Sequence, residues 1–246
     1  MSKNISIANK WQQLKKHTKA RVALGNVGTG LPLGEVLALK HAHAMAKDAI
    51  VTKLDVDGLS QNCKEQAIPY QIFNSEASDR LVYLKRPDLG RQLLFSTNLK
   101  KTEKVDIVFV ITDGLSAKAV NTNAFKVLNH LLPNINEDYS FAIALVQQGR
   151  VAIGDAVAEL YRADFVAVCI GERPGLSSPE SMGIYTTYKP KIGFTDERRN
   201  CISNIHIDGL SGKQGAQLLQ YLIEKSFALK TSGVALKLEV GEILKS

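Results

Sequence analysis

Several side chains that can perform catalysis are present, and their spacing decides which of them can act together. Cys201 and His206 could form a nucleophile and its base, but five positions along one strand would place them on opposite faces. Glu172 and Glu180 could form an acid–base pair, although the sequence defines no geometry for it. From the residues alone, no convergent catalytic set emerges.

The histidines give a weak signal for a metal site. His41 and His43 are two positions apart on an expected helix, so their side chains do not share a face. His17, His130 and His206 are isolated in the sequence. We therefore interpret the histidines as surface or capping residues.

Composition bounds the class of protein. The chain has 246 residues, of which 45% are hydrophobic and 22% are charged, as in an ordinary globular protein. It contains no run of about 18 apolar residues and no secretory signal pattern at its start. Cys63, Cys169 and Cys201 have neither disulfide nor metal-ligand spacing, which favours a reducing cytoplasm.

The net charge of +7 raises the question of nucleic-acid binding. Lysines and arginines are spread along the chain, without interleaved aromatic residues or a reader motif. We predict no nucleic-acid partner and no membrane partner. The charge favours a solvated surface, or a basic face for an acidic protein.

The elements that would position these residues alternate between strands and helices in the second half of the chain. Apolar runs at residues 105–111, 140–146 and 165–170, with a shorter one at 201–205, read as buried strands. Helical patterns follow three of them, at 116–132, 153–161 and 213–230. This order predicts an α/β fold with a mostly parallel sheet flanked by helices.

The first hundred residues read differently. Residues 5–53 look helical, with a glycine-rich turn at 25–34. Residues 80–84 read as a short extended segment, and residues 85–93 as a turn that opens a helix.

Ligand-binding features gather where the expected strands end. The segments TDG, QQGR, GERPG and HIDG each follow a strand, and ligands of open α/β sheets bind beyond the carboxyl ends of strands. Residues 170–190 form an apparently irregular stretch with two tyrosines, Tyr185 and Tyr188. Together they predict a platform for a large or amide-rich ligand, with Glu172 as a hydrogen-bond acceptor.

A dinucleotide is the default ligand of such a sheet, but its motif is missing. The first strand is followed by TDGLSAKAV, which has one glycine where G-x-G-x-x-G is needed. The glycine-rich turn at 25–30 has the wrong spacing. Nucleotide binding is therefore the weaker hypothesis.

Six motifs spread over the chain have a family resemblance in common. They are 86-RPDLGR-91, 113-DGLS-116, 149-GRV-151, 171-GERPGL-176, 185-YTTYKP-190 and 201-CISNIH-206. Together they resemble the small subunit of ethanolamine ammonia-lyase, and the likeness runs from Ala20 to about Gly233. The pair GERPGL and CISNIH is the most specific part.

The resemblance implies an adenosylcobalamin-dependent lyase that converts ethanolamine to acetaldehyde and ammonia by a radical route. In this family a large subunit, a TIM barrel, carries the chemistry. The small subunit has a Rossmann-like sheet that helps to enclose the corrinoid at the subunit interface. Carried over by motif, the cobalamin-contacting residues are Val151, Glu172 and Cys201.

The resemblance also implies that cobalt keeps the cofactor's own dimethylbenzimidazole. The chain lacks D-x-H-x-x-G, by which other B12 proteins donate a histidine, so no protein histidine ligand is expected. Residues 1–100 would be an N-terminal helical and connecting region, and residues 101–246 the Rossmann-like cobalamin-contacting domain. Family members often lie in bacterial microcompartments. The turn at 25–32 lacks two arginines that relatives carry.

Two alternatives of other classes remain at this stage. One is a stand-alone Rossmann-like protein that binds a nucleotide or metabolite, and the other is a structural scaffold of a compartment. The first would need phosphate-binding glycines after residues 105–111.

Overall fold

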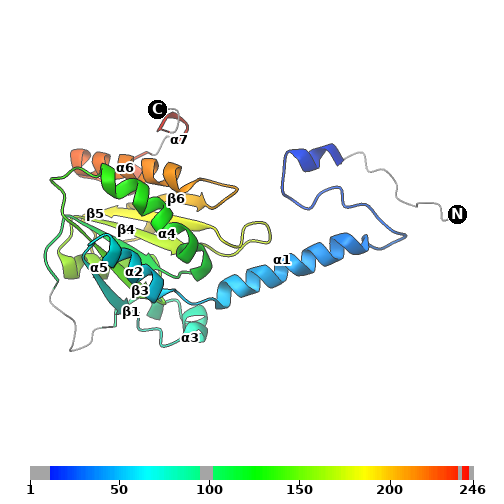
Figure 1. Ribbon diagram of the computed structural model, residues 1–246, viewed down its shortest axis with the longest axis horizontal. Coiled ribbons are helices and arrows are strands. Elements are labelled where there is room, and N and C mark those ends of the chain that lie inside the picture. Colours follow the sequence, from blue (N-terminus) through cyan, green and yellow to red (C-terminus); the bar gives the residue numbers. More distant parts are fainter. Residues whose placement is uncertain (1–11, 95–101, 238–239, 244–246) are drawn as a thin grey trace.

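A computed structural model of the chain describes residues 12–94, 102–237 and 240–243. Its centre is a six-stranded mixed sheet with the strand order β1-β3-β2-β4-β5-β6 (Figure 1). The strands are β1 (Tyr70–Asn74), β2 (Ile107–Thr112), β3 (Phe141–Gln147), β4 (Phe165–Gly171), β5 (Met182–Tyr188) and β6 (Asn200–Ile205).

The sheet is parallel on one side and antiparallel on the other. β1, β3, β2 and β4 pair in parallel, whereas β5 is antiparallel to both β4 and β6. Every residue of β2 and β4 is buried, which explains their unbroken apolar sequences. The predicted mostly parallel sheet flanked by helices is confirmed.

Helices cover the two faces of the sheet unequally. The helices of the chain are α1 (Leu33–Val51), α2 (Val56–Glu65), α3 (Arg80–Lys85), α4 (Ala117–Leu131), α5 (Ile153–Tyr161), α6 (Gly212–Leu229) and the short α7 (Val240–Ile243). α2, α4 and α6 share one core with the sheet, in which Leu128 and Leu219 meet Phe109. On the other face α5 packs Val157 against Val108 and Val168. We call these the α4 face and the α5 face.

Short 3-10 turns complete the described structure. They are η1 (Gln12–Lys16), η2 (Leu89–Arg91), η3 (Leu132–Asn134), η4 (Asp196–Arg198) and η5 (Gly233–Ala235). η2 confirms the turn expected in residues 85–93, and η4 lies in the loop that joins β5 to β6.

The predicted strands at 105–111, 140–146, 165–170 and 201–205 are confirmed as β2, β3, β4 and β6, as are the three helices that follow. The extended segment predicted at 80–84 is wrong, because these residues form α3. The Asp79 carboxylate accepts hydrogen bonds from the backbone N–H groups of Leu81 and Val82, which caps a helix. This cap outweighs the strand preference of the apolar residues that follow.

The prediction that residues 170–190 are irregular is also wrong, because residues 182–188 form the strand β5. The loop between β4 and β5 is confined to residues 172–181, and β5 pairs with β4 over its whole length. Thr186 and Thr187 are polar but buried, so the apolar alternation that marks a strand is obscured.

The helical prediction for residues 5–53 is right for α1 and wrong for residues 17–24, which form a connecting segment. The glycine-rich turn predicted at 25–34 is confirmed by a tight turn at Val27 and Gly30. Residues 5–11 of that prediction lie outside the described residues. In Figure 1, α1 projects from the body of the molecule, and the segment before it turns back so that η1 lies next to α1, where Lys15 pairs with Glu35. We call residues 12–51 the arm.

Gly171 shows how closely the loops pack at the carboxyl end of β4. A Cβ atom at this position would overlap the carbonyl oxygen of Ser116. Gly171→Ala should therefore lower the free energy of unfolding by about 1–3 kcal/mol, as overpacking does. Gly175→Ala is the matched control, since its Cβ would meet only ordinary contacts. Urea denaturation of both variants measures the difference, and equal stability would contradict this packing.

Candidate functional site

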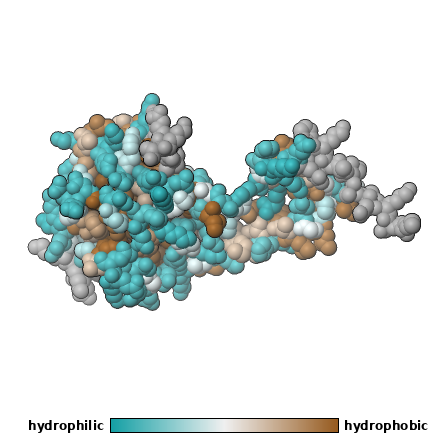
Figure 2. Space-filling model, turned by 45° about the horizontal axis from the view of Figure 1, so that its top comes forward, coloured by the Kyte–Doolittle hydropathy of each residue, from teal (hydrophilic) through white to brown (hydrophobic). Residues whose placement is uncertain are grey.

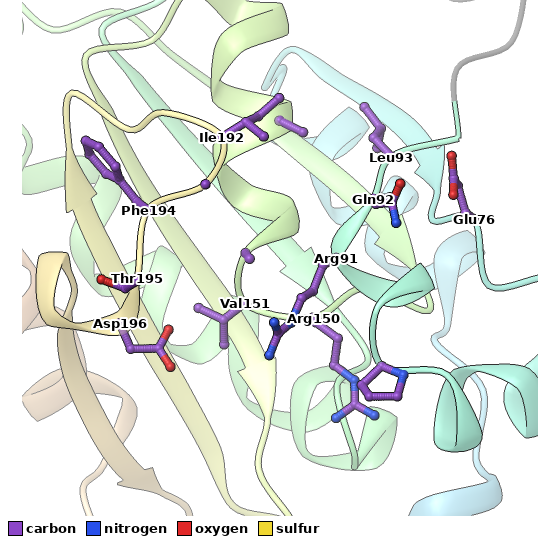
Figure 3. Close-up of a pocket in the computed structure, with 14 residues that line it drawn as sticks. Glu76, Arg91, Gln92, Leu93, Arg150, Val151, Ile192, Phe194, Thr195 and Asp196 are labelled. Carbon is purple, nitrogen blue, oxygen red and sulfur yellow. The ribbon is translucent and has the colours of Figure 1, made fainter.

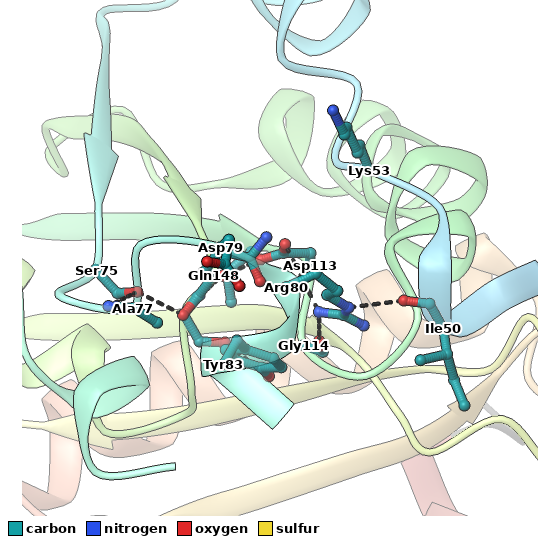
Figure 4. Close-up of polar contacts among 12 residues, drawn as sticks. Ile50, Lys53, Ser75, Ala77, Asp79, Arg80, Tyr83, Asp113, Gly114 and Gln148 are labelled. Atoms are coloured by element: carbon teal, nitrogen blue, oxygen red, sulfur yellow. Dashed lines mark hydrogen bonds and ion pairs between the residues drawn. The ribbon is translucent and has the colours of Figure 1, made fainter. Parts of the chain in front are cut away.

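The carboxyl ends of the parallel strands form the edge where a ligand is expected. The loops after β2 and β3 leave toward opposite faces, to α4 and α5, so a crevice would open between them. In this chain the crevice is filled by side chains of α3 (Figure 4). Tyr83 of α3 is completely buried there.

Arg80 holds α3 in the crevice. Its guanidinium donates hydrogen bonds to the carbonyl oxygens of Ile50 and Gly114, both at 2.7 Å, and lies 3.9 Å from the Asp113 carboxylate. The ring of Tyr83 lies between the guanidinium groups of Arg80 and Arg150, which are 4.8 and 4.2 Å from its centroid. The place where a nucleotide would bind is thus occupied by the protein's own groups.

Asp113 is held within the same network. Burial raises the pKa of the Asp113 carboxyl, and the positive charge of Arg80 opposes that rise. The Asp113 carboxylate accepts a hydrogen bond from the Thr112 hydroxyl at 3.3 Å, and that hydroxyl accepts one from the backbone N–H of Gly149 at 3.0 Å, which ties the loop after β3 to the end of β2. We interpret Asp113 as a structural residue of the crevice.

The open part of the sheet lies on the α5 face of β5 and β6. α5 packs over β2 and β4, and the side chains of Cys201 and Ser203 on β6 remain exposed. Tyr185 of β5 is paired directly with Cys201 and packs at the border of the α5-face core. We call this surface, with Glu172 at its edge, the platform.

Glu172 follows the last residue of β4 and is held in place by two hydrogen bonds. Its carboxylate accepts one from the Ser181 hydroxyl at 2.5 Å and one from the backbone N–H of Asn204 at 3.3 Å. Gly183 lies beside it, where an added Cβ would come within 3.0 Å of the carboxylate. Each carboxylate oxygen keeps a free acceptor site, and the missing side chain at Gly183 leaves room next to them.

Cys201 and Tyr185 form the centre of the platform. Cys201 is open to solvent on one side, but the protein atoms packed around its thiol desolvate it and raise its pKa. Desolvation likewise raises the pKa of the Tyr185 hydroxyl, and the charge of Glu172 adds to the rise at each. Both groups therefore stay protonated at neutral pH. A protonated thiol is a poor nucleophile, so Cys201 fits a contact role rather than a catalytic one.

Val151 lies in the turn between β3 and α5 and lines a cavity of about 670 Å³ (Figure 3). The opposite wall is the loop from β5 to β6, which contributes Ile192, Phe194 and Asp196. Arg91 enters the cavity from a third side, and no acidic partner of Arg91 occurs among the described residues. The cavity wall is mainly apolar and also carries two arginines, Arg91 and Arg150, and two carboxylates, Glu76 and Asp196.

A buried ion pair holds this loop against α5. Both nitrogens of the Arg199 fork donate to the carboxylate of Asp155, at 2.9 and 2.7 Å, and one also donates to the Thr187 hydroxyl at 3.0 Å. The side chains of Arg199 and Asp155 are each 1% exposed. Since Asp155 is four residues after Val151 and Arg199 is two residues before Cys201, the pair joins both parts of the site.

Of the three predicted cofactor-contacting residues, two lie together and the third lies at the adjacent cavity. Glu172 and Cys201 both belong to the platform, and the Glu172 carboxylate accepts from the backbone N–H of Asn204 on β6, the strand that carries Cys201. Among the described residues Val151 forms no hydrogen bond or ion pair with either of them, and it borders the adjacent cavity. Asp196 links the two regions, because it lines the cavity and also acts on Tyr185.

Glu180 and His206, which the sequence suggested as partners of Glu172 and Cys201, contact other residues instead. Glu180 forms an ion pair with Lys118 of α4, so it does not serve Glu172. His206 lies beyond the end of β6, where its Nδ1 accepts a hydrogen bond from the backbone N–H of Asp208. Within residues 12–94, 102–237 and 240–243, no group of three or more His, Cys, Asp or Glu side chains could hold a metal ion.

Several supporting residues were not predicted. The Arg199–Asp155 pair spans 44 positions and leaves no local pattern in the sequence. Tyr83 and Arg80 were assigned to a strand, which hid their role in filling the crevice. A helix cap signal at Asp79 could have identified α3.

A search for membrane-spanning segments finds, in the part of the chain that is described, no helix long and apolar enough to cross a bilayer.

Comparisons with known proteins give a consistent result. The family model described as ethanolamine ammonia-lyase light chain (EutC) matches residues 8–237. The ethanolamine ammonia-lyase small subunit of Pseudomonas putida (strain GB-1) is 45% identical over 238 residues, which cover 93% of this chain and 88% of that protein. The one from Xanthomonas campestris pv. campestris (strain B100) is 45% identical over 236 residues, covering 92% and 87%. That of Pseudomonas aeruginosa (strain LESB58) is 41% identical over 241 residues, covering 94% and 88%.

Breaking the buried ion pair tests how the site is held together. Arg199→Met leaves the Asp155 carboxylate buried without its partner and should lower the free energy of unfolding by about 3–5 kcal/mol. The double variant Asp155→Leu/Arg199→Met should recover most of that loss, since no buried charge remains. Arg198→Met, next in sequence and exposed, is the control and should change stability by less than about 0.5 kcal/mol. Urea denaturation measures all three, and an Arg199→Met protein as stable as the parent would refute this role.

Proposed function

The chain belongs to the ethanolamine ammonia-lyase light-chain family, and on this premise we propose that it encloses adenosylcobalamin together with a large subunit. The assembled enzyme would convert ethanolamine to acetaldehyde and ammonia. The large subunit, a TIM barrel in this proposal, would carry the reacting groups, and the present chain would form the other wall of the cofactor site.

One observation carries the proposal for this chain. Three of the motifs that resemble the family supply Val151, Glu172 and Cys201 to the α5 face of the sheet, in a region that α5 leaves partly open. The strands from β3 to β6 span four steps of about 4.8 Å, roughly 19 Å in all. That width suits a macrocycle with peripheral side chains.

The residues present fit the chemistry of a corrinoid. Its edge carries amide groups that donate hydrogen bonds, and Glu172 offers two fixed acceptor oxygens beside the space left by Gly183. Val151 and the protonated Cys201 supply contacts without charge. The apolar cavity beside Val151, with Arg91 at one side, could receive an extended part of the same ligand.

The residues of this chain would bind and orient the cofactor and exclude water from it. When bound, adenosylcobalamin supplies the radical chemistry through its cobalt–carbon bond. Glu172 would fix the rotation of the macrocycle through its peripheral amides, and the side chains of Val151 and Cys201 would set its distance from the sheet. We propose that cobalt keeps the cofactor's own benzimidazole as ligand, without a histidine of this chain.

Three finer parts of the proposal concern organisation. We describe the sheet as Rossmann-like, and we regard residues 101–246 as the cobalamin-contacting domain and residues 1–100 as the N-terminal helical and connecting region. β1 lies before residue 100 and pairs with β3, so the two regions share one sheet. We propose a cytoplasmic location, inside a bacterial microcompartment where the host forms one.

Reconstitution tests the function directly. This chain alone should show no deamination of ethanolamine. Mixed with its large subunit and adenosylcobalamin, it should yield acetaldehyde, and the purified complex should show the absorption spectrum of a bound corrinoid. Turnover by the chain alone, or a complex that retains no corrinoid, would refute the proposal.

Glu172→Ala tests the contact assigned to the carboxylate. The assembled complex should bind cobalamin more weakly by about 1–3 kcal/mol, because peripheral amides lose an acceptor in a desolvated site. Glu180→Ala is the matched control, since Glu180 lies in the same loop and pairs with Lys118. Equilibrium binding measured with the two complexes decides the assignment. Equal affinity for both variants would show that Glu172 does not touch the cofactor.

A further inference from the structure

The arm leaves one side of α1 without a covering layer. α1 has 19 residues, yet Ala49 is the single residue in it that is buried. One side of the helix is partly covered, including Val36, Leu39 and Met45. Apolar residues that stay exposed on the other side of such a helix are expected to pack against another protein surface.

The uncovered side of α1 is an ordered stripe. Leu33, Leu37, Ala44 and Val51 are spaced so that they lie within about 40° of one another around the helix. All four are exposed, Leu33 at 72% and Leu37 at 55%. Brown apolar atoms along the arm are visible in Figure 2. This spacing is that of a helix that docks into an apolar groove.

Charge indicates what kind of surface fits the stripe. Lys40 and Lys47 lie beside it on the helix, and residues 12–51 contain six lysine or arginine residues against two acidic residues. A second copy of this basic chain would bring lysines near lysines, which opposes self-association. The partner surface should therefore be an apolar groove with an acidic rim on a different protein.

The arm is fixed to the body at the carboxyl edge of the sheet, the edge at which Glu172 follows β4. Arg80 holds the carbonyl oxygen of Ile50, near the end of α1, to the loop that follows β2. Asn121 of α4 donates to the carbonyl oxygen of Lys53 and accepts from the backbone N–H of Asp55. Away from this base, Lys19 forms an exposed ion pair with Asp208, a contact type that contributes little stability.

We propose that the exposed stripe of α1 is a docking element for the large subunit, separate from the cofactor platform. This rests on the proposed function, which supplies the partner. A single large subunit could then cover the platform and hold the arm, because both start from the carboxyl edge of the sheet. The arm would secure the complex independently of the cofactor.

A double variant of the stripe tests this. Leu33→Glu/Leu37→Glu should weaken binding to the large subunit by roughly 100-fold or more, because two buried leucines are lost and charges face the acidic rim. Thermal unfolding of the isolated variant should match the parent, since both side chains are exposed. Leu229→Glu, at the end of α6 and 60% exposed, is the matched control and should bind like the parent.

Each result has a defined meaning. If the stripe variant binds the large subunit as tightly as the parent, or if Leu229→Glu weakens binding equally, the docking role is wrong. If sedimentation shows that the isolated parent chain dimerises and the stripe variant does not, the stripe binds a second copy and the proposal is overturned. Failure of the parent chain itself to bind the large subunit would instead refute the proposed function.

Discussion

The buried pair of Arg199 and Asp155 is the interaction on which the geometry of the site depends. Asp155 belongs to the first turn of α5, and Arg199 precedes β6, so one ion pair fixes a helix against the far side of the sheet. Burying two charges is costly unless both are fully hydrogen-bonded, and here the fork of the guanidinium and the Thr187 hydroxyl help to meet that demand. The loop between β5 and β6 is thereby held as a wall, with the cavity on one side and the platform on the other.

The openness of the platform follows from how the strands are connected. Parallel neighbours need crossover helices, and α5 covers the face over β2 and β4 because it joins β3 to β4. β5 and β6 are antiparallel to their neighbours and need no crossover on that face. The chain thus closes the crevice between β2 and β3 with Tyr83 and exposes a wide surface farther along the sheet. This arrangement suits a broad ligand better than a nucleotide.

Sequence patterns predicted the strands whose residues are all buried and apolar. They missed the elements that combine buried polar residues or a helix cap with apolar residues. β2 and β4 are buried on both faces, so their apolar runs are unambiguous. β5 buries two threonines, and α3 begins with a cap and continues with apolar residues, so both depart from simple periodicity. The candidate site residues came from motifs. Their supports could not be predicted, because contacts such as Arg199 to Asp155 join distant segments.

The open platform and the uncovered arm both indicate that this chain leaves surfaces exposed for another molecule to cover. A protein that functions as a monomer would be expected to cover an apolar stripe such as that of Leu33, Leu37 and Val51 on α1, which this chain leaves exposed. A cofactor of the size of cobalamin has two broad faces, so a single platform can cover only one of them. In the proposed complex, the chain that supplies one wall must also hold its partner in register with that wall. An arm rooted through Arg80 at the same edge of the sheet meets this requirement, since any shift of the arm would be transmitted to the loops that border the platform.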